Sequence, residues 1–338
     1  MSPQPGQPTP EKITRFAWGY VPPLVLEAAV RNGIFDAIDG GAETVADVCA
    51  KTGISERGAR AIMDALAGME LLVKSDGVRY ALSPEAATFL VSRSPTNITG
   101  MAARASSMMA KWLALSDIVR TGRPERSLNS EAEGAEFFEG LVTDLFPMNY
   151  GAARAAAEKL GVSASSEPVR VLDLAAGSGV WSIAIAQRSP NVTVTAVDWP
   201  GVLEVTRRTA ARFGLADRYS FVAGDLAEAD FGSGHNIATL GHILHSEGEE
   251  RSRALLKKTF HALAPGGTAV IAEFLVNADR SGPLQGLIFN INMLVNSEHG
   301  ATFSFEEIRG WMEQTGFKDV RTVDAPSPSP LIFATRPS

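Results

Sequence analysis

The sequence predicts an α/β protein whose two halves have different rhythms. From about residue 11 to 160, apolar residues recur with helical spacing nearly throughout. From Val169 onward, short β-branched runs alternate with amphipathic helical stretches, which is typical of a parallel sheet with crossover helices. With 338 residues, the chain is also long enough for two domains of ordinary size.

Composition narrows the class of protein. The chain is 45% hydrophobic and 20% charged, as in ordinary soluble globular proteins, and its net charge of −7 gives no general attraction to nucleic acid or anionic membranes. Cys49 is the single cysteine, which excludes an internal disulfide and fits a reducing compartment. We find no signal-peptide pattern and no apolar run near the ~20 residues that span a bilayer. We therefore expect a cytoplasmic protein without a membrane partner.

The N-terminal part begins with a long apolar stretch. Residues 13–38 predict one helical segment that bends near Pro22 and Pro23, because proline cannot donate a helical hydrogen bond. Thr44 is the expected cap of a helix that ends at Gly53.

A second helix and a hairpin follow this first capped helix. Ser55 opens a helix that runs to Met69, and two short apolar runs, 71–73 and 80–82, flank a turn at residues 76–77. Helix, turn, helix and hairpin together are the pattern of a winged helix.

A winged helix raises the hypothesis of DNA binding, which the charges oppose. Between residues 40 and 93 there are six basic and seven acidic residues. A surface that binds phosphates needs an excess of basic residues. We expect a packing or dimerisation role and no nucleic-acid partner.

Between the two halves lies a helical region rich in Ala, Met and Phe, interrupted by a predicted loop at 121–134. Apolar and polar side chains alternate closely around Phe146, Met148 and Asn149. Two interpretations stay open for these residues: ordinary core packing, or one wall of a substrate pocket.

The strongest local signal lies at residues 169–180. An apolar strand ends in Asp173, and the small-residue loop Leu-Ala-Ala-Gly-Ser-Gly then leads into a helix predicted at 181–189. Small residues allow a ligand to approach the backbone, and the start of a helix offers unpaired N–H groups.

Two further strands end in acids. Residues 192–197 lead to Asp198, and residues 219–222 lead to Gly224 and Asp225. An acid at the tip of the second strand is suited to binding ribose hydroxyls, and the carboxyl edge of an open α/β sheet is where ligands bind. The loop lacks the Gly-x-Gly-x-x-Gly spacing of dehydrogenases. A Leu-Ala-Pro-Gly-Gly turn at 263–267 is expected to precede another strand, 268–274.

This ordered set of motifs resembles the class I S-adenosylmethionine-dependent methyltransferases. It is most similar to small-molecule O-methyltransferases with an N-terminal winged-helix dimerisation domain, as in plant phenylpropanoid and bacterial polyketide and carotenoid pathways. The resemblance spans nearly the whole chain and implies a Rossmann-like, seven-stranded sheet and a homodimer. It departs at Ala175, where the family often has glycine.

The resemblance implies cofactor contacts residue by residue. Asp173, Ala175 and the backbone of Gly177 and Gly179 would flank the methionine part of S-adenosylmethionine. Asp198 would hold the ribose and Trp199 would cover an adenine edge. Asp225 would bind the adenine amino group, with Leu226 beside the ring. Gly224 and His242 are the other expected cofactor contacts.

Transfer of a methyl group to a hydroxyl benefits from a base, and histidine serves this role near neutral pH. His245 follows the strand predicted at 236–240, where the family carries its general base. The family triplet is His-Asp-Trp, whereas this chain has His-Ser-Glu. Glu273 would orient the imidazole, and Thr302 stands near the place where plant relatives have another acid.

An apolar helical stretch near residue 290 contains the acceptor-binding helix that the resemblance implies. Asn292 and Asn296 lie four residues apart on one face and either grip acceptor oxygens or only cap and solvate the helix. Met293 is an acceptor contact or core filler. No residues have metal-ligand spacing along the sequence, so we expect no metal.

These observations predict three regions: a winged-helix-like dimerisation domain at 11–100, a helical linker and acceptor-pocket region at 101–160, and a catalytic domain at 161–338. The predicted activity is methylation of a small-molecule acceptor at a hydroxyl of an aromatic or polyketide-like secondary metabolite. The alternatives are nitrogen or carbon methylation, an S-adenosylmethionine-binding enzyme with other chemistry (a hydroxylase, decarboxylase or pericyclase), and a winged-helix regulator.

Overall fold

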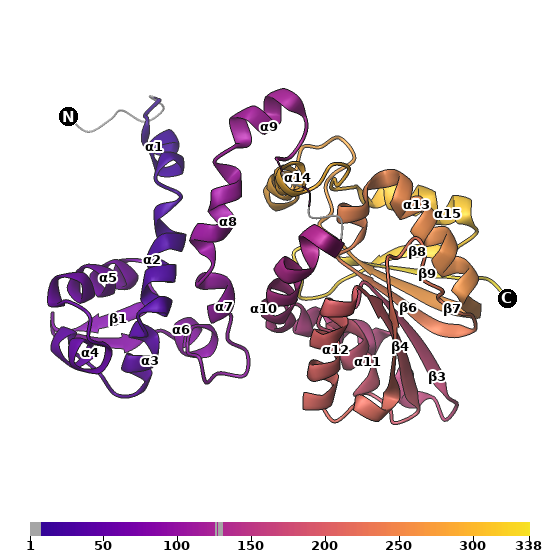
Figure 1. Cartoon of the computed structure of the whole chain (residues 1–338), viewed down its shortest axis with the longest axis horizontal. Helices are drawn as coiled ribbons and strands as arrows, with labels where there is room; N and C mark the ends of the chain where they lie inside the picture. The colour runs from indigo at the N-terminus through magenta and orange to yellow at the C-terminus, as the bar shows by residue number, and fades with distance from the viewer. Residues whose placement is uncertain (1–7, 126, 128–130) are drawn as a thin grey trace. The chain divides into compact units, whose positions relative to one another are not determined.

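The chain divides into two units, Met1–Ala110 and Lys111–Ser338, each with its own hydrophobic core. The computed structural model describes residues 8–125, 127 and 131–338. Figure 1 shows a helical N-terminal unit with a small hairpin and a C-terminal unit built on a large sheet.

The N-terminal unit confirms the predicted order of helix, helix and hairpin. Thr44 and Asp47 form a reciprocal capping box, in which each side chain accepts a hydrogen bond from the other residue's backbone N–H. The elements of this unit are α1 (Glu11–Ala17), α2 (Val21–Arg31), α3 (Ile34–Asp39), α4 (Val45–Thr52), α5 (Glu56–Gly68), β1 (Leu72–Ser75), β2 (Arg79–Leu82), α6 (Pro84–Phe89), α7 (Thr99–Ala102) and α8 (Ala105–Trp112).

The single helical segment expected at 13–38 is wrong: it consists of parts of three helices. Pro22 and Pro23 lie in the first turn of α2, where a missing N–H is harmless, so the chain breaks just before them. A second break occurs at Gly33, whose φ of 68° is left-handed and favours glycine.

Four of the six basic side chains of the winged-helix part have carboxylate partners. Arg60 pairs with Glu56 at 2.8 Å and Lys74 with Asp64 at 2.6 Å. The further ion pairs of this part are Arg79–Glu43 and Arg93–Asp39. This pairing agrees with the expectation of no nucleic-acid partner, which stays a prediction.

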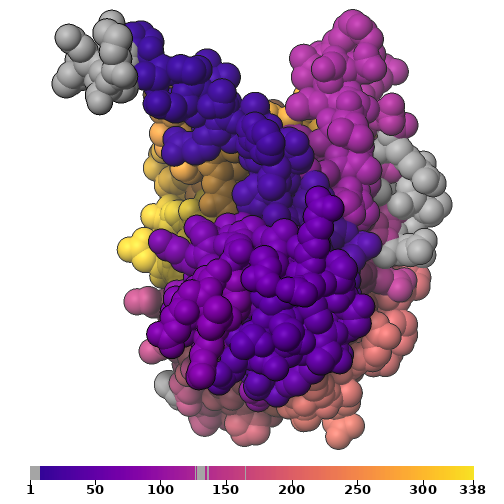
Figure 2. Space-filling view, turned by 90° about the vertical axis from the view of Figure 1, so that its left-hand side faces the viewer, coloured from indigo at the N-terminus to yellow at the C-terminus, as the bar shows by residue number. Residues whose placement is uncertain are grey.

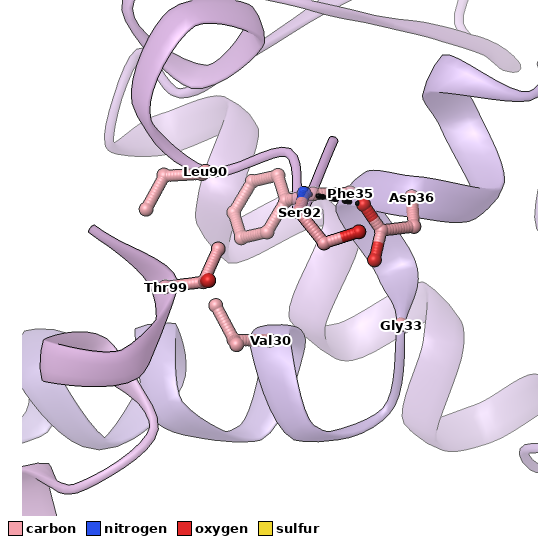
Figure 3. Close-up of a pocket in the computed structure, with 7 residues that line it drawn as sticks. All are labelled: Val30, Gly33, Phe35, Asp36, Leu90, Ser92 and Thr99. Atoms are coloured by element: carbon pink, nitrogen blue, oxygen red, sulfur yellow. Dashed lines mark hydrogen bonds between the residues drawn. The ribbon is translucent and has the colours of Figure 1, made fainter. Parts of the chain in front are cut away.

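A small pocket of about 150 Å³ lies in the N-terminal unit (Figure 3). The charged group in its lining is the Asp36 carboxylate, which accepts a hydrogen bond of 2.8 Å from the backbone N–H of Ser92. The fold itself therefore uses this carboxylate.

The C-terminal unit contains the predicted seven-stranded sheet, in the order β5-β4-β3-β6-β7-β9-β8. Five strands are parallel, and β8 and β9 add an antiparallel pair, as the family resemblance implied. The elements are α9 (Leu115–Thr121), α10 (Glu131–Lys159), η1 (Val162–Ala164), β3 (Val169–Leu174), α11 (Val180–Ala186), β4 (Val192–Asp198), α12 (Pro200–Arg212), η2 (Ala216–Arg218), β5 (Tyr219–Ala223), β6 (His235–Gly241), α13 (Leu244–Ala262), β7 (Leu263–Ala272), α14 (Leu284–Asn296), α15 (Phe305–Thr315), β8 (Lys318–Val323) and β9 (Leu331–Thr335).

Helices cover both faces of this sheet (Figure 1). Alternate residues of the central strands point to opposite sides: Val171 belongs to the core beneath α10 and α11, and Leu172 to the core beneath α13 and α15. Because both faces are covered, these strands read as continuous apolar runs.

Three predicted boundaries in this unit need correction. Helix α10 begins at Glu131, so the loop expected at 121–134 extends too far, and residues 126 and 128–130 lie outside the described part. The helix expected at 181–189 is α11, which begins one residue earlier, at Val180, and ends three residues earlier, at Ala186. The turn expected at 263–267 lies within β7, where pairing with β6 passes irregularly from Leu263 to Thr268.

A second capping box begins α15: the Ser304 hydroxyl accepts the N–H of Glu307 at 3.2 Å, and the Glu307 carboxylate accepts the N–H of Ser304 at 2.7 Å. None of the helices in the described part of the chain has both the length and the apolar character that crossing a membrane requires.

Candidate active site

The structure brings the three predicted acids to one edge of the sheet. Asp173 pairs with Ala196 across β3 and β4, and Asp198 pairs with Ala223 across β4 and β5. Asp225 follows two residues later. The carboxyl ends of three adjacent parallel strands therefore meet here.

Asp173 is fully enclosed by protein. Its carboxylate accepts hydrogen bonds from the hydroxyls of Thr239, at 2.6 Å, and of Ser182. Burial raises the pKa of Asp173 to about 6, against the opposing effect of these hydroxyls. The carboxylate thus ties β3 to α11 and β6, and sequence analysis missed both partners. Thr239 lies directly opposite Asp173 in the pairing of β3 with β6, a register that no local pattern reveals.

The loop after β3 has the backbone that its small residues predicted. Ala175, Gly177 and Gly179 have φ values of 51°, 57° and 75°. A Cβ atom at Gly179 would also lie only 3.0 Å from Thr206 Cγ2. Ala175 adopts a left-handed conformation that glycine prefers. The backbone is therefore strained at this position, where the family often has glycine.

Asp198 holds this loop in place. Its carboxylate accepts hydrogen bonds from the backbone N–H groups of Gly177, at 2.9 Å, and Trp199, at 2.7 Å. Burial raises the pKa of Asp198 to about 6, while the two N–H groups oppose the increase.

Helix α10 packs over the same loop. A Cβ at Gly177 would lie 3.3 Å from Val142, and the ring of Phe138 meets Trp199 edge-on at 5.8 Å. At Gly201, a Cβ would lie 2.1 Å from the Glu139 carboxylate, so a larger residue there would require this flexible side chain to move. No local pattern indicates this contact, because α10 and α12 are distant along the chain.

Asp225 lies within a charged network. Its carboxylate accepts the Ala227 N–H at 2.8 Å and an Arg251 N–H at 2.9 Å, and Arg251 also donates to Glu247 at 2.5 Å. Gly224 donates its N–H to the Asp198 carbonyl at 3.0 Å, and Leu226 is buried in the core. The spacing of Glu247 and Arg251 at i, i+4 was a signal that sequence analysis overlooked.

His245 and Glu273 form a buried pair, as the sequence predicted for residues at neighbouring strand ends. Imidazole Nδ1 lies 2.7 Å from Glu273 Oε2, and the backbone N–H of His245 donates to Oε1 at 3.2 Å. Burial alone would raise the pKa of Glu273. The positive charge that His245 can carry, and the hydrogen bonds that it donates, outweigh the effect of burial and hold the pKa of Glu273 below its usual value.

Two glycines allow the chain to close around His245. Gly248 interrupts α13 with φ 72° and ψ 177°, and a Cβ there would lie 2.4 Å from the His299 carbonyl oxygen. A Cβ at Gly300 would lie 2.7 Å from the His245 carbonyl, which instead accepts the Ala301 N–H at 2.9 Å. The segment after α14 therefore packs on the backbone of His245.

His242 is the most unusual side chain of the site. It has a left-handed φ of 60°, and its Nδ1 is buried without a hydrogen-bond partner among the described residues. Burial lowers the pKa of His242 to about 4, so the ring is uncharged at neutral pH.

Aromatic rings surround these two histidines. Phe274 and Phe289 stack with ring centroids 3.9 Å apart, and Phe289 meets His245 edge-on at 4.9 Å. Phe274 also lies 5.0 Å from His242, and Trp181 lies 6.2 Å from it on another side. The sequence did not predict a place in the site for Phe274, Phe289 or Trp181.

The expected acceptor residues lie in varied surroundings. Asn296 donates its amide N–H to the Asn292 side chain at 3.1 Å, so the two asparagines bond to each other, and Met293 is buried. Phe146 stacks on Tyr150 and Phe213 in the core beneath α10. On the same helix, Met148 is 49% exposed and Asn149 is half-buried.

Thr302 was predicted to stand near the place where plant relatives have a second acid. It is buried, its hydroxyl has no hydrogen-bond partner among the described residues, and its N–H donates to the Asn290 side chain at 2.9 Å. His245 therefore has Glu273 as its carboxylate partner.

The structure also brings together a group that spacing along the sequence did not indicate. One ligand-type atom from each of His242, His245 and Glu273 lies within 4.8 Å of the others. His242 and Glu273 are 31 residues apart along the chain and meet because β6 and β7 are adjacent.

The fold and the acids at its carboxyl edge define a nucleoside-binding α/β enzyme. Family models identify residues 14–92 as an O-methyltransferase dimerisation domain and residues 112–318 as an O-methyltransferase domain. The chain belongs to this O-methyltransferase family and is an S-adenosylmethionine-dependent enzyme.

Individual relatives agree with this assignment. The chain is 31% identical to 3-hydroxy-5-methyl-1-naphthoate 3-O-methyltransferase of Streptomyces sahachiroi, over 94% of this chain and 92% of the relative. It is 26% identical to a tetracenomycin polyketide synthesis 8-O-methyltransferase of Streptomyces glaucescens, over 97% of each chain. The crystal structure of a candidate O-methyltransferase from Nostoc punctiforme matches with a TM-score of 0.88 and 27% identity, over 98% of this chain and 100% of that one.

The buried carboxyl of Asp173 predicts a pH-dependent stability. Its pKa is raised from 3.8 to about 6, so between these values the native state binds more protons than the unfolded chain and wild-type stability falls as pH rises. Asp173→Asn does not titrate. Relative to wild type, it is expected to gain about 2–3 kcal/mol in free energy of unfolding between about pH 4 and pH 7.

Urea unfolding at these two pH values measures this gain, with exposed Asp217→Asn as the matched control. An equal stability difference at both pH values would contradict the assignment.

Proposed function

We propose that this enzyme methylates a hydroxyl of an aromatic or polyketide-like small molecule, with His245 as the general base. The observation that supports this proposal is the buried His245–Glu273 pair, with its 2.7 Å contact, at the carboxyl edge of the sheet. Acceptors of this kind are named for both Streptomyces relatives.

The pair has a defined proton arrangement. An ionised carboxylate only accepts hydrogen bonds, so Glu273 holds the proton on Nδ1 of His245 and leaves the Nε2 lone pair for the acceptor's hydroxyl proton. The lowered pKa of Glu273 keeps the carboxylate charged, which stabilises the imidazolium that forms. S-adenosylmethionine supplies the methyl group on its sulfonium, and the chain's task is to align the acceptor and exclude water.

The remaining cofactor assignments fit the geometry of the edge. Ala175, Gly177 and Gly179 open a small-residue backbone, and the fixed carboxylate of Asp198 is the proposed ribose partner. Asp225 is the proposed partner of the adenine amino group, with Leu226 and Trp199 beside the ring. Asp173 acts here as a positioning residue, because its oxygens are engaged by Ser182 and Thr239.

The aromatic rings near His245 supply an apolar surface for a flat acceptor. Phe274 and Phe289 stack beside the base, and stacking with an aromatic acceptor would orient its hydroxyl. Asn292 and Asn296 on α14 are the proposed polar contacts, with Met293 as support.

Phe146, Met148 and Asn149 on α10 are proposed at the outer acceptor wall. Phe146 contributes there through the core packing that fixes the helix. The cytoplasmic location stays a prediction.

The N-terminal unit is proposed to form a homodimer. Helix α1 buries none of its residues and extends from the body of its unit (Figures 1 and 2). Ile13, Phe16 and Trp18 are 73%, 67% and 67% exposed, which is unusual for a cluster of large apolar side chains. The match to a dimerisation domain supports the same surface.

Sedimentation velocity tests the dimer. The wild type is expected at twice the 35.9 kDa of one chain, and the double variant Ile13→Asp, Phe16→Asp is expected to shift toward the monomer because two charges would enter an apolar interface. A monomeric wild type, or an unchanged dimer in this variant, would overturn the proposed surface.

Removal of the base tests the proposed chemistry. With S-adenosylmethionine and a panel of phenolic acceptors, the wild type should yield O-methylated products detectable by mass spectrometry. His245→Gln is expected to lower kcat by about 10²–10⁴-fold, as for general-base loss. Glu273→Gln should also reduce kcat, since it no longer stabilises the imidazolium.

The control for this experiment is His299→Gln, because the His299 side chain is 75% exposed. The role of His245 is rejected if His245→Gln retains kcat within about threefold of wild type, the margin expected for a group outside the chemistry.

A further inference from the structure

The group formed by His242, His245 and Glu273 has the composition of a transition-metal site. Two imidazoles and one carboxylate are the protein ligands of several open zinc centres. The three ligand-type atoms come from separate points of two adjacent strand ends and lie within 4.8 Å of one another. His245 and Glu273 are 7% and 4% exposed, so the group is shielded from bulk water.

A second, independent observation concerns His242. Its Nδ1 is buried and has no hydrogen-bond partner among the described residues. A buried polar atom without a partner calls for an explanation, such as an ion or water. In addition, His242 is held in a left-handed conformation, with φ 60°, and its ring centroid lies 6.4 Å from that of His245.

We infer that His242, His245 and Glu273 bind a divalent transition metal of the zinc type, and that this ion inhibits the enzyme. The ion adds to the activity proposed above and is not required for it. Metal binding itself does not rest on the proposed function; only inhibition does, through the role of His245 as base.

The ligand types and distances favour a metal ion of intermediate softness, such as Zn²⁺, over Mg²⁺ or Ca²⁺. Zinc bonds of about 2.1 Å in tetrahedral geometry place two ligand atoms about 3.4 Å apart. With all three ligand atoms within 4.8 Å of one another, the most distant pair has to close by at most roughly 1.4 Å. Mg²⁺ and Ca²⁺ prefer sites made of oxygen ligands, whereas two of the three ligands here are imidazoles.

Inhibition follows from what the ion displaces. The proton between His245 Nδ1 and Glu273 Oε2 occupies the 2.7 Å contact on which the proposed base depends. An ion that binds Glu273 and Nδ1 of His245 replaces the Nδ1 proton, which moves to Nε2 as the ring takes its other neutral tautomer, so this hydrogen bond is lost and Nε2 has no free lone pair. The imidazole can then no longer accept the acceptor's proton in the proposed geometry.

Co²⁺ titration of the full chain, in the absence of cofactor and acceptor, tests the site directly. Tetrahedral Co²⁺ is coloured, so binding is read from visible absorption, and Zn²⁺ should displace it. We expect one saturable Co²⁺ per chain. No saturable absorption in the wild type would overturn the inference.

Variants locate the ion. His242→Asn removes the imidazole while asparagine tolerates the left-handed backbone, and circular dichroism checks that the fold is kept. This variant should bind Co²⁺ at least about 100-fold more weakly, because loss of outer-shell partners alone weakens metal binding by 10–100-fold. Exposed His299→Gln should bind as wild type does.

Equal Co²⁺ affinity in wild type and His242→Asn would also overturn the site. If Co²⁺ binds as expected but His245→Gln retains methyl transfer, the metal site stands and the proposed base fails. The two claims therefore fail by different measurements.

Discussion

The Asp198 carboxylate is the interaction on which the rest of the site depends. It ends β4 and binds the backbone N–H groups of Gly177 and Trp199, so one side chain fixes both the loop after β3 and the start of α12. Gly224 then donates to the Asp198 carbonyl, which links the loop after β5 to the same residue. The loops after three adjacent strands are thereby linked through one residue.

Burial acts differently on the carboxylates of the edge. Asp173 and Asp198 accept only neutral donors, so desolvation dominates and raises their pKa values to about 6. Glu273 is equally enclosed, but the neighbouring imidazole can become a cation and reverses the balance. The acid beside the histidine therefore keeps its charge to a lower pH than Asp173 and Asp198 do, which suits the orienting role proposed for Glu273.

Strand ends, caps and the approximate positions of strands were predictable, because each has a local pattern. The run from Val169 to Asp173, the Thr44 cap and the Ser304 cap each depend on residues near one another in sequence. The break before Pro22 was misplaced, since proline fits the first turn of a helix as well as a bend. Contacts set by sheet register, such as Asp173 with Thr239, had no such pattern.

The same distinction explains the active site. His245 and Glu273 were predicted because each follows a strand whose neighbour in the sheet could be inferred from the family resemblance. Phe274, Phe289 and the partnerless nitrogen of His242 were not, because their roles depend on how α14 and two strand ends pack together. Glycines such as Gly201 and Gly248 were also missed, since only the packed structure shows the atoms that a side chain would meet.

Calorimetric titration with S-adenosylhomocysteine, the product form of the cofactor, tests the central role of Asp198 most directly. Wild type is expected to bind one molecule per chain, and Asp198→Asn to bind about 10–100-fold more weakly, because hydrogen bonds to a charged acceptor contribute about 1.5–3 kcal/mol. Exposed Asp217→Asn should bind as wild type does. Undiminished affinity in a folded Asp198→Asn protein, or no binding by the wild type, would contradict the account.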